Sequence, residues 1–226
     1  MQQGVESMKK FKMIMCLALA VLLVNPIFTV SAADNNYNEQ VIDDLFEGLN
    51  DTDKVLEMPE GGFLFGKAEI YDAEDESIKL GEYDSSTDRQ SITVKDAKQQ
   101  LIEGDQQFSE MQARATSIPS QVMVLAPGQV YISKKFSGTG WRIGGYKFKA
   151  GGNGTWLKWS TFIDDGRVGD SGDVANQLNN SSALYGSALY KGYPQYFSGG
   201  MTTGEHVMIY FTHNPINGTY YRVENN

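Results

Sequence analysis

The chain changes character near residue 115. Residues 34–115 carry 21 Asp and Glu against 7 Lys and Arg, a net charge of −14. Residues 116–226 carry 6 Asp and Glu against 9 Lys and Arg, a net charge of +3, and contain all three tryptophans. A change of this size indicates two differently built segments. The sequence therefore predicts an acidic N-terminal segment over 34–115 and a separate domain over 116–226.

Residues 1–33 have the pattern of a secretory signal peptide. Three lysines within 9–12 form a positive start, and the apolar run over 13–24 is shorter than the roughly 20 residues that span a bilayer. Small residues favour cleavage after Ala32 or Ala33. We therefore expect a secreted, extracellular protein, and an uncut membrane anchor is the less favoured interpretation.

The single cysteine, Cys16, lies inside this apolar run, so the mature chain has none. An exported protein without disulfides must rely on its apolar core, which favours a bacterium over a eukaryotic secretory pathway. The positive start directly follows Met8, whereas the residues before it include Glu6. Translation is therefore predicted to start at Met8, with Met1 as the alternative.

The acidic segment contains two helical patterns. Apolar residues recur at helical spacing within 38–49, which predicts a short helix there. A second helix is predicted over 94–113, with Thr93 as its N-cap and Asp96 at the third helical position. Short apolar pieces near 63–71 and 78–80 resemble strands. We expect a small α+β or partly disordered segment.

The C-terminal segment alternates with period two. Val122 and Val124 open the pattern, and Pro127-Gly128 fits a type II turn. Hairpins are expected through the glycine-rich residues 150–154 and between the last two strands. A helical turn is expected at 174–178. Strands are predicted near 121–125, 130–132, 143–148, 155–163, 183–190, 195–197, 206–212 and 219–223. This is the pattern of an antiparallel β-sandwich or barrel in a mainly β protein.

A glycine-rich loop concentrates acidic residues of the C-terminal segment. Carboxylates on flexible backbone suit Ca²⁺, which prefers hard oxygen ligands. The spacing of an EF-hand is absent, and Arg167 competes as a counter-ion, so a solvated hairpin loop is the favoured interpretation. No other cofactor is expected. The residues of the calcium hypothesis are Asp164, Asp165, Asp170 and Asp173.

Aromatic residues are abundant after residue 116, where 17 Phe, Trp and Tyr occur. A two-layer sheet protein buries one face of each strand, so some of these rings are expected on the surface, where they can stack on sugars. Packing between neighbouring strands is the competing interpretation. The predicted ligand-binding residues are Trp141, Trp156, Tyr185, Tyr190, Tyr193 and Tyr196.

No catalytic pattern accompanies these features. His206 and His213 are the only histidines, and no nucleophile motif or phosphate-binding glycine loop occurs. We therefore expect a protein that is not an enzyme. A secreted hydrolase using Asp164 and Asp170 is a third interpretation, because paired carboxylates hydrolyse glycosides.

The favoured functional hypothesis is a secreted bacterial β-sandwich protein that acts as an extracellular binding module for cell-envelope glycan, a protein, or copies of itself. The alternative is a precursor whose acidic pro-region masks a basic, aromatic-rich toxin or bacteriocin-like domain. Membrane contact is expected only in that alternative. Nucleic acid is not an expected partner, because residues 34–226 carry a net charge of −11.

Overall fold

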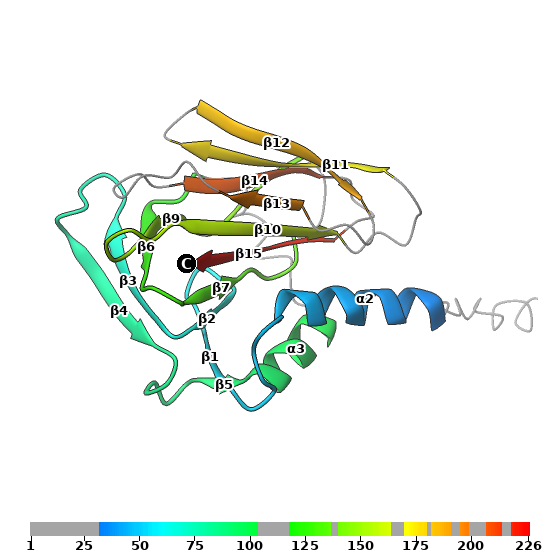
Figure 1. Cartoon of the computed structure of the whole chain (residues 1–226), viewed down its shortest axis with the longest axis horizontal. Coiled ribbons are helices and arrows are strands. Elements are labelled where there is room, and N and C mark those ends of the chain that lie inside the picture. Colours follow the sequence, from blue (N-terminus) through cyan, green and yellow to red (C-terminus); the bar gives the residue numbers. More distant parts are fainter. Residues whose placement is uncertain are drawn as a thin grey trace, which may run out of the picture. The chain divides into compact units, whose positions relative to one another are not determined.

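In the part of the chain that the structure describes, the fold consists of two packed β-sheets and two short helices (Figure 1). The structure, a computed structural model, describes residues 32–103, 118–136, 140–163, 170–179, 182–190, 195–198, 207–213 and 218–226. The prediction of a mainly β protein with a β-sandwich is confirmed.

Sheet A has seven strands within the described ranges, and each neighbouring pair is antiparallel. The C-terminal strand β15 lies inside this sheet, between β10 and β7, rather than at its edge. In spatial order the strands are β13 (Gln195–Ser198), β10 (Leu157–Ile163), β15 (Thr219–Asn225), β7 (Val130–Ile132), β2 (Phe63–Phe65), β1 (Lys54–Glu57) and β5 (Ile92–Thr93).

Sheet B has eight strands within the same ranges, counting β8 (Gly140–Ile143), which pairs with β14 beside the main path. The pair β6–β9 is parallel and the other pairs are antiparallel. In order, its strands are β12 (Ser182–Tyr190), β11 (Asp170–Asn179), β14 (Val207–His213), β9 (Lys147–Ala150), β6 (Gln121–Leu125), β3 (Lys67–Asp72) and β4 (Lys79–Asp84).

The sandwich core fills the space between the two sheets. Alternate residues of each strand point into it, as the period of a β-strand requires. Trp159, fully buried, packs its ring against Phe148 and Tyr221. The sandwich core consists of Leu56, Met58, Leu64, Ala68, Ile70, Met123, Leu125, Tyr131, Tyr146, Phe148, Ala150, Leu157, Trp159, Ile163, Tyr221 and Val223.

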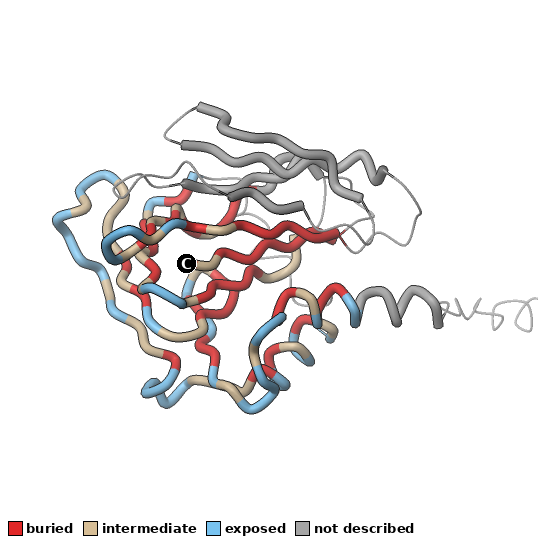
Figure 2. Tube along the Cα trace, in the orientation of Figure 1, coloured by how far each residue is buried: buried red, intermediate tan, exposed pale blue. Residues whose placement is uncertain are grey.

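The helix-side core lies on the other face of sheet A, where α2 (Ala32–Leu45) and α3 (Val94–Glu103) cover it. Figure 2 shows buried residues continuing from the sheet onto these helices. The helix-side core consists of Val41, Ile42, Leu45, Phe46, Val55, Phe63, Val94, Ala97, Leu101, Val130, Ile132, Phe162 and Tyr220. Strands β1, β2, β7, β10 and β15 of sheet A therefore contribute buried residues on both of their faces.

The two predicted helices are found with shifted bounds. The helix predicted near 38–49 spans 32–45, and the one predicted over 94–113 spans 94–103, beyond which its predicted end lies outside the described residues. The predicted capping box is confirmed. The Asp96 backbone N–H donates to Thr93 Oγ1 at 3.1 Å, and Thr93 Oγ1 donates to Asp96 Oδ2 at 2.6 Å.

The predicted division at residue 115 does not separate two sheets. Strand β2 of the acidic segment pairs with β7, and β3 pairs with β6, so strands from both segments lie side by side in both sheets. Residues 33–226 form one compact unit. The change of composition near residue 115 thus does not mark a boundary between the two sheets.

Both predicted hairpins of the C-terminal segment are wrong. β9 lies in sheet B and β10 in sheet A, so the glycine-rich residues 151–154 carry the chain from one sheet to the other. β14 and β15 are likewise in different sheets. The helical turn predicted at 174–178 lies within strand β11 instead, where two neighbouring strands provide its backbone partners.

Candidate functional site

Asn225, which is buried, ties three chain segments together at one end of the sandwich. Its Nδ2 donates to Leu125 O at 2.7 Å and to Gly151 O at 2.8 Å. Its backbone oxygen accepts from Gly128 N at 2.7 Å. We call residues 125–129, 151–156 and 225–226 the Asn225 loop cluster. These bonds fix three loops that are distant in sequence.

The turn over 126–129 was predicted and is confirmed. Gln129 N donates to Ala126 O at 3.2 Å, and Gly128 has a φ of 73°, which suits glycine at this position of a type II turn. The side chain of Gln129 also donates to Pro127 O at 2.9 Å. Pro127 is thereby held in place at the surface.

Trp156 is the exposed aromatic residue of the Asn225 loop cluster. Its backbone exchanges two hydrogen bonds with Asn226, at 3.2 and 3.0 Å, and its side chain is 39% exposed. The preceding loop is closed by Thr155 Oγ1, which donates to Gly151 O at 2.7 Å. A large apolar ring is thus presented to solvent from a backbone with little freedom.

A shallow hollow of about 270 Å³ lies beside this cluster. Its floor is the outer face of sheet B, where Glu69 of β3 is opposite Glu82 of β4 on one side and Val124 of β6 on the other. Its lining includes Lys67, Glu69, Glu82, Val124, Pro127 and Gly152. The hollow therefore joins small apolar surfaces to charged groups.

Lys79 organises the two carboxylates of the hollow. Its Nζ lies 2.6 Å from Glu69 Oε1 and 2.7 Å from Glu82 Oε2. Hydrogen bonds from Lys79 and then from the Tyr71 hydroxyl lower the pKa of Glu69, while those two carboxylates raise the pKa of Lys79. Glu69 is thus held ionised as an acceptor, the opposite of the raised pKa that a general acid needs.

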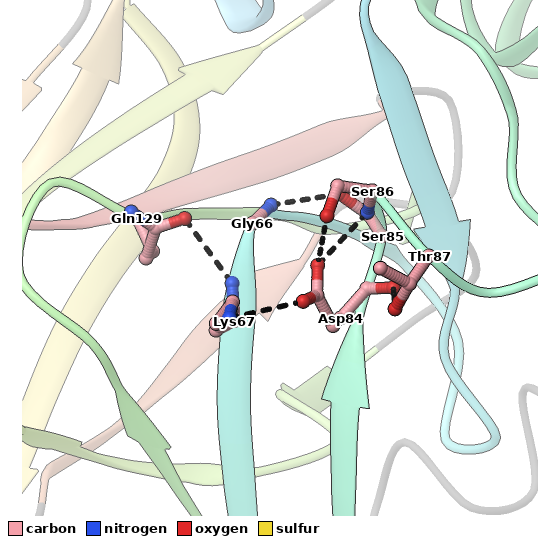
Figure 3. A network of polar contacts seen from close by, with 7 residues as sticks. All are labelled: Gly66, Lys67, Asp84, Ser85, Ser86, Thr87 and Gln129. Atoms are coloured by element: carbon pink, nitrogen blue, oxygen red, sulfur yellow. Dashed lines mark hydrogen bonds and ion pairs between the residues drawn. The ribbon is translucent and has the colours of Figure 1, made fainter.

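Figure 3 shows the network that supports the rim of the hollow. Lys67 Nζ pairs with Asp84 at 3.2 Å, and Lys67 N donates to Gln129 Oε1 at 3.1 Å. Gly66 N donates to Ser85 Oγ at 2.8 Å. A Cβ at Gly66, where φ is 88°, would lie 1.2 Å from Gln129 Oε1. The network joins β3, β4 and the turn that carries Pro127.

Of the predicted ligand-binding residues, Trp156 is placed on the surface by the structure. The others are placed by backbone alone or lie outside the described residues, as Tyr193 does. Trp141 lies in β8, Tyr185 and Tyr190 in β12, and Tyr196 in β13. Because β13 belongs to sheet A and the other two strands to sheet B, the backbone does not gather these residues on one strand.

The calcium hypothesis stays a prediction. Asp164 and Asp165 lie outside the described residues, and Asp170 and Asp173 are placed by their backbone in β11. Within the described part of the chain, no group of three or more His, Cys, Asp or Glu could hold a metal ion. His213 ends β14, and His206 is outside the described ranges.

The charged residues of the hollow were not predicted from the sequence. Lys67, Glu69 and Tyr71 alternate with buried Ala68 and Ile70, which is the signal of a strand with one solvent face.

None of the helices in the described ranges is long and apolar enough to cross a membrane. The chain matches no protein-family model and no curated protein.

Proposed function

We propose that this protein is a secreted bacterial binding module that holds a glycan of the cell envelope at the Asn225 loop cluster. The observation that carries the proposal is the exposed residue Trp156 on a backbone fixed by Asn226, in the same loop cluster as Pro127 and Gly152, which line a hollow with two carboxylates paired to Lys79. The signal-peptide pattern of residues 1–33 and the cysteine-free mature chain support secretion.

A sugar ring has the chemistry that this surface complements. Its apolar face of C–H groups stacks on an indole, and its hydroxyl groups donate to carboxylates in charge-assisted hydrogen bonds. Trp156 offers the first kind of contact, and Glu69 and Glu82 of the hollow offer the second to another sugar of the same polymer. A shallow, open site suits a polymer, which has to lie across a surface rather than enter a closed cavity.

Rigidity of the site supports binding further. Ordering a loop on binding reduces affinity, and a loop that is already fixed avoids that cost. Asn225 holds the three loops of the cluster, and Lys79 holds the two carboxylates. The contact of Lys79 with Glu69 also favours binding over acid–base hydrolysis, because it lowers the pKa of Glu69 and keeps this carboxylate ionised.

The acidic segment belongs to the working protein in this proposal. It supplies β3 and β4, and with them Lys67, Glu69 and Glu82 of the hollow. Cleavage and release of residues 34–115 as a pro-region would remove this part of the site. The structural arrangement therefore favours the binding module over the masked-toxin hypothesis.

The test is retention of the mature protein on insoluble bacterial peptidoglycan. Trp156→Ala should weaken retention at least about tenfold, equivalent to about 1.4 kcal/mol, because the stacking surface is lost. Ile118→Ala is the matched control, since Ile118 is also an exposed apolar residue but precedes β6 at the end opposite the Asn225 loop cluster. Equal retention of Trp156→Ala and the unchanged protein would refute the proposal.

A further inference from the structure

The two edges of sheet B are built differently. β4 forms one edge and β12 the other, with β3 and β11 as their neighbours (Figure 1). An edge strand exposes unpaired backbone groups that can pair with a strand of another chain, and proteins protect such edges with charges, bulges and short strands. The distribution of these protective features over the two edges indicates which edge is open.

The β4 edge is protected. This strand has six residues, and Lys79, Glu82 and Asp84 are charged. All three take part in ion pairs, with Lys79 between Glu69 and Glu82, and Asp84 with Lys67. Its register with β3 is interrupted between the pairs formed by Ile70 and Tyr71, as in a β-bulge. A strand of a second chain that paired with β4 would meet both the ion-paired charges and the interrupted register.

The β12 edge lacks the charges. This strand has nine residues, none of them charged and none proline. Among the described strands it pairs with β11 alone, and Figure 1 shows it as the outermost strand of its sheet. Its register with β11 shifts twice, between the pairs at Ala183 and Tyr185 and between those at Ala188 and Tyr190, and is regular from Tyr185 to Ala188. The β12 edge therefore differs from the β4 edge in its length and its lack of charge, and its regular neutral stretch spans residues 185–188.

We propose that β12 pairs antiparallel with β12 of a second copy of this protein, forming a two-fold dimer with one continuous sheet. A neutral strand opposite its own copy brings no like charges together, even though residues 34–226 of each chain carry a net charge of −11. Because the β4 edge is protected, the assembly closes after two copies instead of growing into a fibre. This inference does not depend on glycan binding.

The test is the molar mass of the mature protein, measured by sedimentation over a concentration series without glycan. The unchanged protein should be a dimer that dissociates on dilution. Ser187→Lys and Ala188→Lys each place a charge in β12, on opposite faces of the strand, and circular dichroism shows which of them keeps the fold. The folded variant should raise the dissociation constant of the dimer at least about tenfold.

Leu80→Lys is the matched control, because it adds the same charge to the β4 edge at a residue that is 50% exposed. This control should remain a dimer. The proposal is overturned if the unchanged protein is a monomer at all concentrations or grows beyond a dimer. It is also overturned if a folded β12 variant keeps the dimer, or if Leu80→Lys dissociates it.

Discussion

The sandwich core and the helix-side core use the same sheet but draw on different parts of the chain. Of the thirteen described residues of the helix-side core, nine come from the acidic segment. Of the sixteen described residues of the sandwich core, eleven come from residues 116–226. The acidic segment is therefore best understood as an outer layer with strands inserted in the sheets, and its charges lie on the solvent side of that layer.

Sheet A connects the two cores through strands with two buried faces. In β7, Tyr131 points into the sandwich core, while Val130 and Ile132 point into the helix-side core. Strand β15 shows the same division between Tyr221 and Tyr220. This explains why all three residues of β7 are apolar and why both tyrosines of β15 are buried.

Arg222 joins the end of the chain to its first described helix. This residue of β15 is buried, and its Nη1 donates to Leu45 O at 3.0 Å and Glu47 O at 2.7 Å, at the C-terminal end of α2. A cation there complements the negative end of the helix dipole. Glu224 pairs with Arg222 and also with Lys158, at 3.1 Å from the latter. The contact between β15 and α2 therefore requires both the acidic segment and residues 116–226.

The largest expected effect comes from dividing the chain at the change of composition. Residues 116–226 alone should not fold, because they lack β1 to β5 and both helices and expose the sides of β7 and β6. The measurement is the amide NMR spectrum of this fragment compared with that of residues 34–226. A well-dispersed spectrum of the fragment would show a separable domain and revive the masked-toxin hypothesis.

The sequence predicted elements that depend on neighbouring residues. The capping box of Thr93 and the turn at Pro127-Gly128 were both found as expected. β1 was not predicted, because Lys54–Glu57 lies in a polar, acidic stretch and only Val55 and Leu56 are apolar. The assignment of β9 and β10 to different sheets depends on contacts between distant residues, and a glycine-rich connection fits a crossing as well as a hairpin.

The candidate site shows the same limit. Trp156 could be predicted because it and Trp159 lie on opposite faces of one predicted strand, and a two-layer sheet protein buries one face of each strand. The hollow beside the Asn225 loop cluster could not be predicted, because Lys67, Glu82 and Gly151 come from separate parts of the chain. Only the pairing of β3 with both β4 and β6 brings them together.

An intermediate effect is expected from the sandwich core. Trp159→Ala should lower the free energy of unfolding by about 3–5 kcal/mol, because it leaves a cavity among rings that pack against one another. Chemical denaturation monitored by circular dichroism measures the loss. Trp156→Ala is the control and should cost less than about 1 kcal/mol, since its ring is partly exposed. Equal losses would mean that the ring contacts of Trp159 do not stabilise the fold.

The smallest effect is expected at the edge of the helix-side core. Thr93→Ala removes the cap of α3 and should cost about 1 kcal/mol in chemical denaturation, because the Asp96 N–H loses its acceptor.

Hydrogen bonds from Thr93 lower the pKa of Asp96. That part of the stabilisation is present above the ordinary pKa of an aspartate and is lost as the pH falls through the lowered value. The difference in stability between Thr93→Ala and the unchanged protein should therefore shrink on acidification. A difference that grows at low pH would mean that Asp96 does not act through Thr93, and that α3 is held by Val94, Ala97 and Leu101 alone.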